Sequence, residues 1–341
     1  MNFKLILCLV PLLATPLFGQ RTPSAPELIS VKKLWSEGQH NAFTDLIRFK
    51  DAWFCTFRES EAHVGGDGKI RVLMSIDGER WGLAGTLSEA GVDLRDPKFS
   101  ITPDNRLMLV LGGSIYEGKT LKGKRPRVSF SKDGKQWSAP QPVMEEDDWL
   151  WRVTWHEGRA YGIAYTVPTK KTAASAPGEW TAKFVSSDDG IHYRTIKQLE
   201  VPGRPNEATV RFLTNGDCVA LLRREGLGAK SERAAWIGTS RAPYEEWKWK
   251  PAGLFVGGPN FIVLPNGEMI VSGREHKLAP DGPKTFVGRM DQNSVTPQLI
   301  LPSSGDCSYP GLVWHEGMLW VSYYSSHEGK SSIYLAKVKA P

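Results

Sequence analysis

The stretch Ser75-Ile-Asp-Gly-Glu-Arg-Trp81 returns as Ser131-Lys-Asp-Gly-Lys-Gln-Trp137 and again as Ser187-Asp-Asp-Gly-Ile-His-Tyr193. The first serines of successive copies are 56 residues apart. In such a turn the aspartate can accept backbone N–H groups, and the closing aromatic residue can pack between neighbouring sheets. The motif therefore predicts a structural turn that recurs with each repeat of the chain.

Pairs of apolar strands joined by tight turns follow the same period. The steps between the six turns are 54, 53, 58, 51 and 50 residues. A repeat of this length, built from short strands, cannot bury its own faces, so its copies must stack, and radial stacking closes a propeller. We expect an all-β fold, a six-bladed β-propeller with four antiparallel strands per blade. The turns lie at Lys50-Asp51, Asp104-Asn105, His156-Glu-Gly158, Asn215-Gly216, Asn266-Gly267 and His315-Glu-Gly317.

The two ends of the predicted domain share one blade. Leu28–Trp35 reads as a strand without a hairpin partner, and the last repeat ends at Ser332–Val338, one strand short. An N-terminal strand that completes the last blade removes two exposed sheet edges. We therefore expect residues 21–341 to form a single propeller domain, with a small-residue loop, Ala173–Gly178, inside blade three.

Residues 1–20 predict a cleavable secretory signal, because Lys4 precedes the apolar stretch Leu5–Leu13 and Gly19 offers a small residue for cleavage. The expected location is therefore secreted or periplasmic. Three cysteines follow this segment, so at least one thiol is unpaired. Cys55 and Cys218 fall in apolar strands, where we expect buried, inert thiols.

The composition of the chain limits the classes of partner that the protein can bind. The formal net charge is +6 over 341 residues, and no Lys/Arg run has interleaved aromatic residues, so we expect no nucleic-acid partner. No later apolar stretch is long enough for membrane insertion.

The histidines show no pair at metal-ligand spacing, so we expect neither a metal nor a cofactor. The two His-Glu-Gly segments match Asn-Gly in sister repeats and are expected to be turns. The oligomeric state stays open.

Propeller geometry separates structural from candidate functional residues. If the hairpin turns lie on one face, first strands begin and second strands end on the other, where polar residues interrupt apolar strands. Arginines there favour an anionic sugar, because a guanidinium binds carboxylate bidentately and stays charged when desolvated. A polar axis filled with mutual ion pairs would explain the same residues without a function. The candidate substrate-binding residues are Arg58, Arg95, Asp96, Arg223, Arg274 and Glu328.

The Ser-x-Asp-Gly-x-x-Trp turns resemble the Asp boxes of the sialidase superfamily, with one residue fewer than the usual Ser-x-Asp-x-Gly-x-Thr-Trp. Asn206-Glu-Ala-Thr-Val210, followed by Leu221-Leu-Arg223, is similar to the strand pair that carries the catalytic glutamate and a carboxylate-binding arginine of that family. Ser308-Tyr-Pro-Gly-Leu312 resembles its Tyr-Ser-x-Leu stretch, which bears the tyrosine nucleophile. The resemblance spans the mature chain and specifies the fold better than the activity.

The resemblance implies a role for each matching residue. Tyr309 would be the nucleophile, Glu207 its base and Arg223 a carboxylate anchor. A neutral tyrosine suits a substrate with a carboxylate beside the anomeric carbon, because a carboxylate nucleophile would be repelled. Asp67 would be the general acid/base, and His63 competes for that role because an imidazole is easily tuned to the working pH.

Departures from the family pattern point to a different sugar. Where sialidases open their first blade with Arg-Ile-Pro, whose arginine completes a triad, this chain has Phe43-Thr-Asp45. Arg58 is the candidate replacement for that arginine. Arg274 ends a strand, whereas the family places its third arginine nearer to Lys284. Asp45 would bring negative charge toward the expected carboxylate position, so sialic acid itself is not favoured.

Three function classes remain open from the sequence. One is an exported glycoside hydrolase that removes a terminal, acidic sugar from a glycan. Another is a lyase acting on uronates, with His63 or Tyr309 as base, and the third is a non-catalytic carbohydrate-binding propeller. Catalysis by tyrosine requires Tyr309 and Glu207 within hydrogen-bond distance. A binding module would expose aromatic platforms, for which Trp151 and Trp155 are candidates, although core packing explains both.

Overall fold

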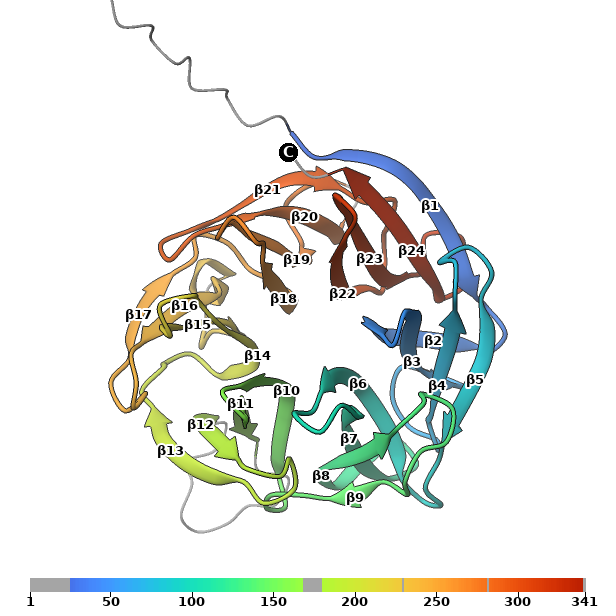
Figure 1. The fold of residues 1–341 in the computed structure, drawn as a ribbon, viewed down its shortest axis with the longest axis horizontal. Helices are drawn as coiled ribbons and strands as arrows, with labels where there is room; N and C mark the ends of the chain where they lie inside the picture. Colours follow the sequence, from blue (N-terminus) through green and yellow to red (C-terminus); the bar gives the residue numbers. More distant parts are fainter. Residues whose placement is uncertain (1–24, 168–179, 229, 281, 340–341) are drawn as a thin grey trace, which may run out of the picture.

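The computed structural model describes residues 25–167, 180–228, 230–280 and 282–339. In this part of the chain, six four-stranded antiparallel sheets are arranged radially around a central opening (Figure 1). The predicted all-β, six-bladed propeller is therefore confirmed. The predicted signal, residues 1–20, and the loop Ala173–Gly178 lie outside the described residues. Within them, no helix has the length and apolar character needed to cross a membrane.

Blades one to five are each built from four strands that follow one another in sequence, the innermost first. The first three blades comprise β2 (His40–Phe49), β3 (Ala52–Ser60), β4 (Lys69–Ser75) and β5 (Gly82–Leu87); β6 (Asp93–Ile101), β7 (Leu107–Glu117), β8 (Thr120–Ser131) and β9 (Gln141–Pro142); and β10 (Asp148–His156), β11 (Arg159–Thr166), β12 (Thr181–Ser187) and β13 (Arg194–Leu199). All six hairpins predicted between first and second strands are present.

The last three blades repeat the pattern, with one short 3-10 turn, η1 (Lys230–Arg233), inserted in blade four. Their strands are β14 (Pro205–Phe212), β15 (Cys218–Arg224), β16 (Trp236–Ser240) and β17 (Lys248–Pro251); β18 (Gly257–Val263), β19 (Met269–Glu275), β20 (Lys284–Met290) and β21 (Val295–Ile300); and β22 (Cys307–His315), β23 (Met318–Ser325), β24 (Ser332–Lys339) and β1 (Glu27–Trp35).

Strand β1 closes the ring. It pairs antiparallel with β24, with Leu28 opposite Val338 and Lys33 opposite Tyr334. Blade six therefore takes its outer strand from the beginning of the described chain and its other three from the end (Figure 1). The predicted closure of the last blade by the N-terminal strand is confirmed.

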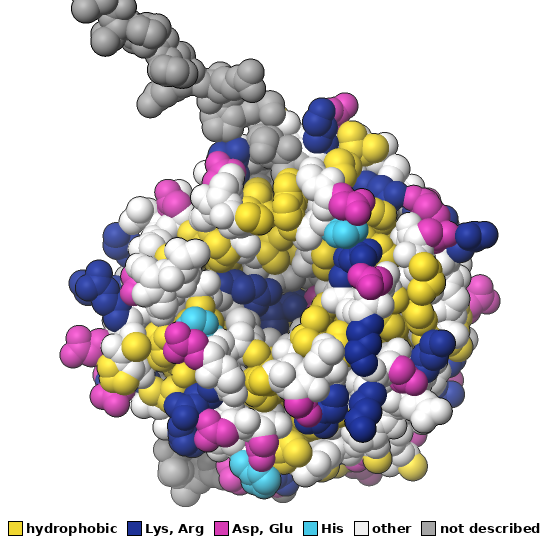
Figure 2. Space-filling model, viewed as in Figure 1, with side chains coloured by type: hydrophobic (Ala, Val, Ile, Leu, Met, Phe, Trp, Pro, Cys, Tyr) yellow, Lys and Arg dark blue, Asp and Glu magenta, His cyan; other side chains and the backbone are white. Residues whose placement is uncertain are grey.

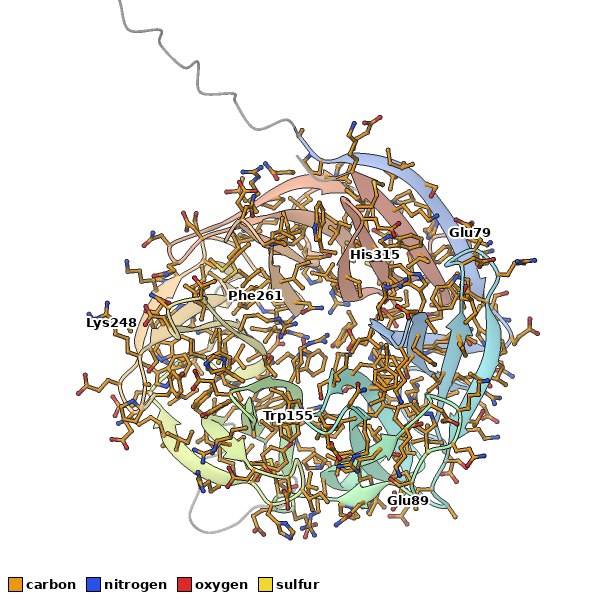
Figure 3. All side chains as sticks on the ribbon, viewed as in Figure 1. Glu79, Glu89, Trp155, Lys248, Phe261 and His315 are labelled. Carbon is orange, nitrogen blue, oxygen red and sulfur yellow. The ribbon has the colours of Figure 1, made fainter. Side chains whose placement is uncertain are left out.

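The hydrophobic core lies between the blades. Side chains fill this space in Figure 3, where Glu79, Glu89 and Lys248 mark the outer edge of the ring. The segment Leu107–Leu111 of β7 is buried on both faces, and a large apolar side chain contributes about 1.5–3 kcal/mol when fully buried. Cys55 and Cys218 are buried and free, as predicted. Burial raises the pKa of both thiols, which keeps them in the unreactive protonated form.

The repeated Ser-x-Asp-Gly turns hold themselves together. Asp77 Oδ1 accepts the backbone N–H groups of Glu79 and Arg80, both at 2.8 Å, and these bonds hold the pKa of Asp77 well below its usual range. Ser75 Oγ accepts the Gly78 N–H at 2.8 Å. The bonds accepted by Asp77 are those predicted for the motif, and the Ser75 bond adds to them. They give the turn a structural role.

A β-bulge in every innermost strand shapes the centre of the propeller. Each first strand places two residues opposite one on its partner, which bends the strand and redirects its side chains. The non-glycine residues Phe43, Asp96 and Tyr309 adopt a positive φ at this point, at 66°, 52° and 50°. On the face drawn in Figure 2, basic side chains gather inside the central opening. The bulged pairs are Phe43-Thr44, Asp96-Pro97, Trp151-Arg152, Asn206-Glu207, Gly258-Pro259 and Tyr309-Pro310.

Candidate active site

A hydrogen-bonded pair from two blades forms the centre of the site. Tyr309 on β22 donates its hydroxyl proton to Glu207 Oε1 on β14, with an O–O distance of 2.5 Å. Tyr309 is 8% exposed and Glu207 6%. The second carboxylate oxygen, Oε2, accepts the Gly258 N–H at 2.8 Å, so the glutamate is held in place. Burial raises the pKa of Tyr309 well above its usual value, and the charge of Glu207 raises it further.

Arg223, at the end of β15, joins both members of this pair. Its Nη1 lies 2.7 Å from Glu207 Oε1 and 3.3 Å from Tyr309 Oη, and its Nη2 lies 2.5 Å from Glu225 Oε1. Burial alone would lower the pKa of Arg223, but Glu207 and Tyr309 hold it well above its ordinary value. The guanidinium therefore stays charged beside the tyrosine oxygen, where it can stabilise negative charge.

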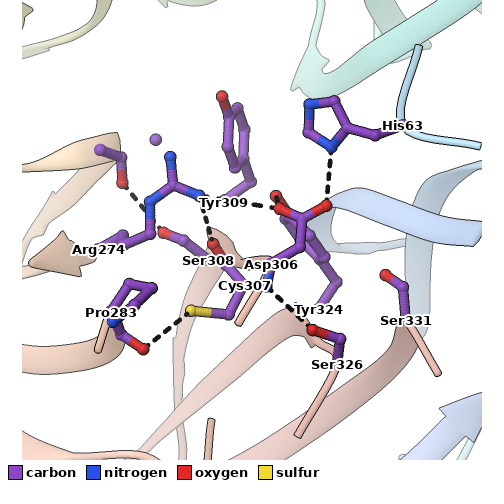
Figure 4. A network of polar contacts seen from close by, with 12 residues as sticks. His63, Arg274, Pro283, Asp306, Cys307, Ser308, Tyr309, Tyr324, Ser326 and Ser331 are labelled. Atoms are coloured by element: carbon purple, nitrogen blue, oxygen red, sulfur yellow. Dashed lines mark hydrogen bonds and ion pairs between the residues drawn. The ribbon is translucent and has the colours of Figure 1, made fainter. Parts of the chain in front are cut away.

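Arg274, at the end of β19, has hydrogen-bonding capacity left over. Nη1 donates to the Cys307 carbonyl oxygen at 3.2 Å and lies 3.8 Å from Asp306 Oδ1. Its Nε is buried and has no partner among the described residues. Figure 4 shows this guanidinium beside Tyr309. The arginine thus presents a positive charge beside Tyr309.

Arg58 and Arg95 are bound by the protein itself to different degrees. Arg58 is fully buried and binds Asp93 through two hydrogen bonds of 2.6 and 3.0 Å. That pairing leaves little of Arg58 for a substrate. Arg95 donates to Tyr116 Oη at 3.1 Å, and its guanidinium carbon lies 5.0 Å from the centre of the Phe43 ring. Arg95 therefore packs against Phe43, which is only 1% exposed.

His63 and Asp306 form a second cluster on the same side of the propeller (Figure 4). His63 Nδ1 lies 2.7 Å from Asp306 Oδ2, and the other oxygen accepts the Tyr324 hydroxyl at 2.8 Å. Burial would raise the pKa of Asp306, but the histidine hydrogen bonds hold it well below its usual range. The His63 ring meets the Phe43 ring edge-on at 5.2 Å, and Phe43 lies 5.1 Å from the Tyr309 ring. His63 is therefore close to the tyrosine, and half of its side chain is exposed.

The structure does not bring Asp67 and Glu328 into contact with the central pair. Asp67 is exposed and accepts the Gly91 N–H at 3.2 Å. Glu328 is bound by Lys33 and by the Tyr334 hydroxyl. Neither carboxylate makes a hydrogen bond or ion pair with Tyr309 or Glu207 in the described part of the chain. Their predicted roles stay predictions.

Asp45 and Lys98 lie buried near the centre. Asp45 is paired with Arg152 at 2.8 Å and accepts the Phe99 N–H at 2.7 Å, so its negative charge is neutralised in place. The Lys98 ammonium lies 5.6 Å from the centre of the Tyr309 ring and 4.7 Å from that of Trp151. Sequence reasoning missed Lys98, because it lies in a strand that otherwise reads as ordinary core.

Three possible metal-ligating atoms converge beside the pocket. His40 Nε2, His63 Nδ1 and Asp306 Oδ2 lie within 4.8 Å of one another, which the sequence spacing did not indicate. A ligating histidine normally donates its other ring N–H to a neighbour. However, His40 Nδ1 is buried without a partner among the described residues, and Arg274 lies 3.8 Å from the carboxylate. The cluster fits a hydrogen-bonded network better than a metal centre.

Solved structures match nearly the whole chain. A protein of unknown function from Dyadobacter fermentans covers 93% of this chain and 100% of its own, at 19% identity and a TM-score of 0.79. A Trypanosoma rangeli sialidase bound to the inhibitor DANA matches 91% of this chain at 12% identity and a TM-score of 0.66. The chain has the sialidase-like six-bladed propeller fold. It spans 58% of the trypanosomal sialidase.

The sialidase-like fold also includes enzymes with another substrate. An α-L-arabinofuranosidase from Fusarium graminearum matches 93% of this chain and 98% of its own, at 12% identity and a TM-score of 0.65. No protein-family model matches the sequence, and no curated protein sequence does either. Identities this low establish the architecture alone, so the activity has to be argued from the site.

Proposed function

We propose that this protein is an exported glycoside hydrolase that removes a terminal, acidic sugar from a glycan, with Tyr309 as nucleophile and Glu207 as its base. The observation that carries the proposal is the 2.5 Å hydrogen bond between these two buried side chains. Nucleophilic catalysis requires a base in this geometry, because a neutral phenol is a weak nucleophile until its proton is removed. Residues 1–20 supply the proposed export signal.

The first step forms a bond between Tyr309 Oη and the anomeric carbon. The hydroxyl proton passes to Glu207 as that bond forms, and the glycosidic C–O bond breaks as its oxygen takes a proton from an acid. In the second step water attacks the anomeric carbon and gives a proton to the same acid residue. Tyr309 then leaves and recovers its proton from Glu207. Arg223, 3.3 Å from the tyrosine oxygen, stabilises the charge that develops there.

Two guanidinium groups near Tyr309 support an acidic substrate. The Arg274 guanidinium lies beside Tyr309 with its side chain 14% exposed, and Arg223 carries charge at the same place. A carboxylate there would be bound by charge-assisted hydrogen bonds. Phe43, whose ring is tilted against that of Tyr309 at 5.1 Å, stands in the place of the first arginine of the sialidase triad. We therefore propose an acidic sugar other than sialic acid.

The binding-module alternative receives less support from the aromatic residues. Trp151 is buried, and its ring lies 5.2 Å from the Tyr309 ring, so it serves as packing beneath the site. The lyase alternative has one observation in its favour, since His63 is held by Asp306 through one ring nitrogen and has the other available as a base. The two reactions give different products, because elimination leaves an unsaturated sugar.

The test compares the purified protein with Tyr309→Phe on a panel of sialosides, uronic-acid glycosides and acidic polysaccharides, with products identified by mass spectrometry. Tyr323→Phe is the matched control, because this buried tyrosine donates to the Pro302 carbonyl oxygen away from the site. We expect the wild type and Tyr323→Phe to release a saturated sugar and Tyr309→Phe to lose this activity. Equal activity in Tyr309→Phe would refute the tyrosine mechanism, and an unsaturated product would establish the lyase.

A further inference from the structure

We infer that Asp96 is the acid/base residue of the proposed reaction, the group that protonates the leaving oxygen and then deprotonates water. The inference rests on the proposed function. Asp96 lies on β6 of blade two, in the bulge of the innermost strand. Tyr309 holds the same place on β22 of blade six, and the two residues share a positive φ, 52° and 50°. The same type of β-bulge therefore positions both side chains at the centre of the ring.

Asp96 differs from the neighbouring carboxylates in what surrounds it. Asp93 accepts two hydrogen bonds from Arg58, Asp306 accepts bonds from Tyr324 and two histidines, and Glu207 accepts three. Asp96 is 9% exposed, yet no described residue donates a hydrogen bond to its carboxylate. The nearest cation, Arg95 Nε, lies 3.9 Å away. A buried carboxyl without donors is best accommodated in its neutral form.

The surroundings of Asp96 and Glu207 suit them to different roles, Asp96 as the acid and Glu207 as the base. Burial raises the pKa of Asp96, and the charge of Glu207 adds to that effect, while Arg95 and Lys98 oppose it. Glu207, with three hydrogen-bond donors, suits the ionised base. Two carboxyl groups whose environments differ in this way are the usual arrangement of an acid and a base in one site. The charged and titratable groups that act on Asp96 or on Tyr309 are Arg95 and Lys98 on β6, Arg58 on β3, Glu207 on β14, and Arg223 and Arg274 on β15 and β19.

Contacts also link Asp96 to the nucleophile. Arg95 Nε lies 3.9 Å from Asp96 Oδ2, and the Arg95 guanidinium carbon lies 5.0 Å from the centre of the Phe43 ring. The Phe43 ring in turn lies 5.1 Å from the Tyr309 ring, so Asp96 and Tyr309 are separated by two contacting side chains. The competing candidates are placed differently. Asp67 is exposed and bound to the Gly91 N–H, and one nitrogen of His63 is taken up by Asp306.

Proton transfers by Asp96 balance the reaction. In the first step the Asp96 carboxyl proton moves to the glycosidic oxygen as its bond to the anomeric carbon breaks. The Tyr309 proton moves at the same time to Glu207. In the second step the Asp96 carboxylate takes a proton from the attacking water, and Glu207 returns its proton to Tyr309. The protein ends each cycle in its starting protonation state.

The test measures how much the Asp96→Asn substitution lowers kcat/KM for substrates with a poor and with a good leaving group. Asparagine tolerates a positive φ, so the bulge is preserved. We expect kcat/KM for an alkyl glycoside to fall at least about 100-fold, whereas a dinitrophenyl glycoside, which needs no protonation, loses about tenfold or less in its first step. We also expect the alkaline limb of the pH–rate profile to disappear. Thermal unfolding monitors the fold of each variant.

A second variant, Asp96→Gly, tests the same role by making room for an external nucleophile. Asp96→Gly accepts the backbone conformation and leaves room for azide, which should restore turnover of the dinitrophenyl glycoside and give a glycosyl azide. His63→Gln and Asp67→Asn are the controls and should keep the wild-type ratio between the two substrates. Equal losses on both substrates in Asp96→Asn, carried by KM, would show a binding role and overturn the inference. Leaving-group dependence in a control variant would assign the acid elsewhere. No hydrolysis by the wild type would instead refute the proposed function, and this inference with it.

Discussion

Replacing Lys98 by methionine should make the propeller more stable and less active. Lys98 is 1% exposed. Its described hydrogen bonds go only to the carbonyl oxygens of Thr44 and Pro97, at 3.3 and 3.2 Å. Burial lowers the pKa of Lys98 to about 8, and Arg152 lowers it further, against the opposing charges of Asp45, Asp96 and Glu207. Charged Lys98 therefore costs folding free energy at neutral pH.

The size of this stability cost follows from the pKa values of Lys98 in the unfolded and the folded protein. A drop from the ordinary value of 10.5 to about 8 corresponds to about 3 kcal/mol, at about 1.4 kcal/mol for each pKa unit. Between these values the unfolded chain binds more protons than the folded one, so the stability of the wild type rises with pH through this window. Below about pH 8 the full penalty applies, and above about pH 10.5 it vanishes.

The assay is thermal and denaturant unfolding of wild type and Lys98→Met from pH 7 to pH 10.5. At pH 7 we expect the variant to be more stable by up to about 3 kcal/mol, about 5 °C in Tm for a domain of this size. The advantage should shrink as the pH rises. The variant should also have a lower kcat, because the cation near Tyr309 is lost. Lys135→Met, at an exposed site, is the control. A less stable variant at pH 7, or a difference independent of pH, would refute the reasoning.

Two further substitutions test the arginines separately. Arg58→Ala should destabilise the protein by about 3–5 kcal/mol in urea unfolding, because the fully buried Asp93 carboxylate loses its two short hydrogen bonds and keeps only the 3.5 Å contact with Arg95. Combining Arg58→Met with Asp93→Leu should recover much of that loss, and no recovery would mean that the pair is not the cause. Arg274→Met should raise KM about tenfold or more for an anionic substrate and little for its neutral methyl ester, since a charged hydrogen bond is worth about 1.5–3 kcal/mol. Equal effects on ester and acid would argue against a carboxylate at this position.

The sequence predicted the architecture well because the propeller repeats a local signal. The hairpin turns at Asn215-Gly216 and Asn266-Gly267 each join two apolar strands, and the same unit returns about every 50 residues. The unpaired strand Leu28–Trp35 and the incomplete last repeat predicted the closure by β1 and β24. The contact between Tyr309 and Glu207 was also anticipated, through the family resemblance.

The rest of the site depends on features that the sequence does not display. Arg58 looks like a free cation in the sequence, and only the packing of blade one on blade two shows that Asp93 occupies it. Lys98 was missed because the bulge just before it, at Asp96-Pro97, changes the direction of the strand. The Asp306 cluster joins residues more than 200 positions apart, which no local pattern reveals.

The pairing of β1 with β24 also sets an order for assembly. Blades one to five consist of strands adjacent in sequence, so each can form soon after synthesis, whereas the last blade must bring together segments about 300 residues apart. Such distant pairing is slow because the entropy cost of closing the loop must be met before the contacts form. Tyr309 lies on the late blade and contacts Phe43 on the first. The candidate site therefore forms only when the ring closes, and the proposed activity should report this final folding event more directly than the amount of β-structure.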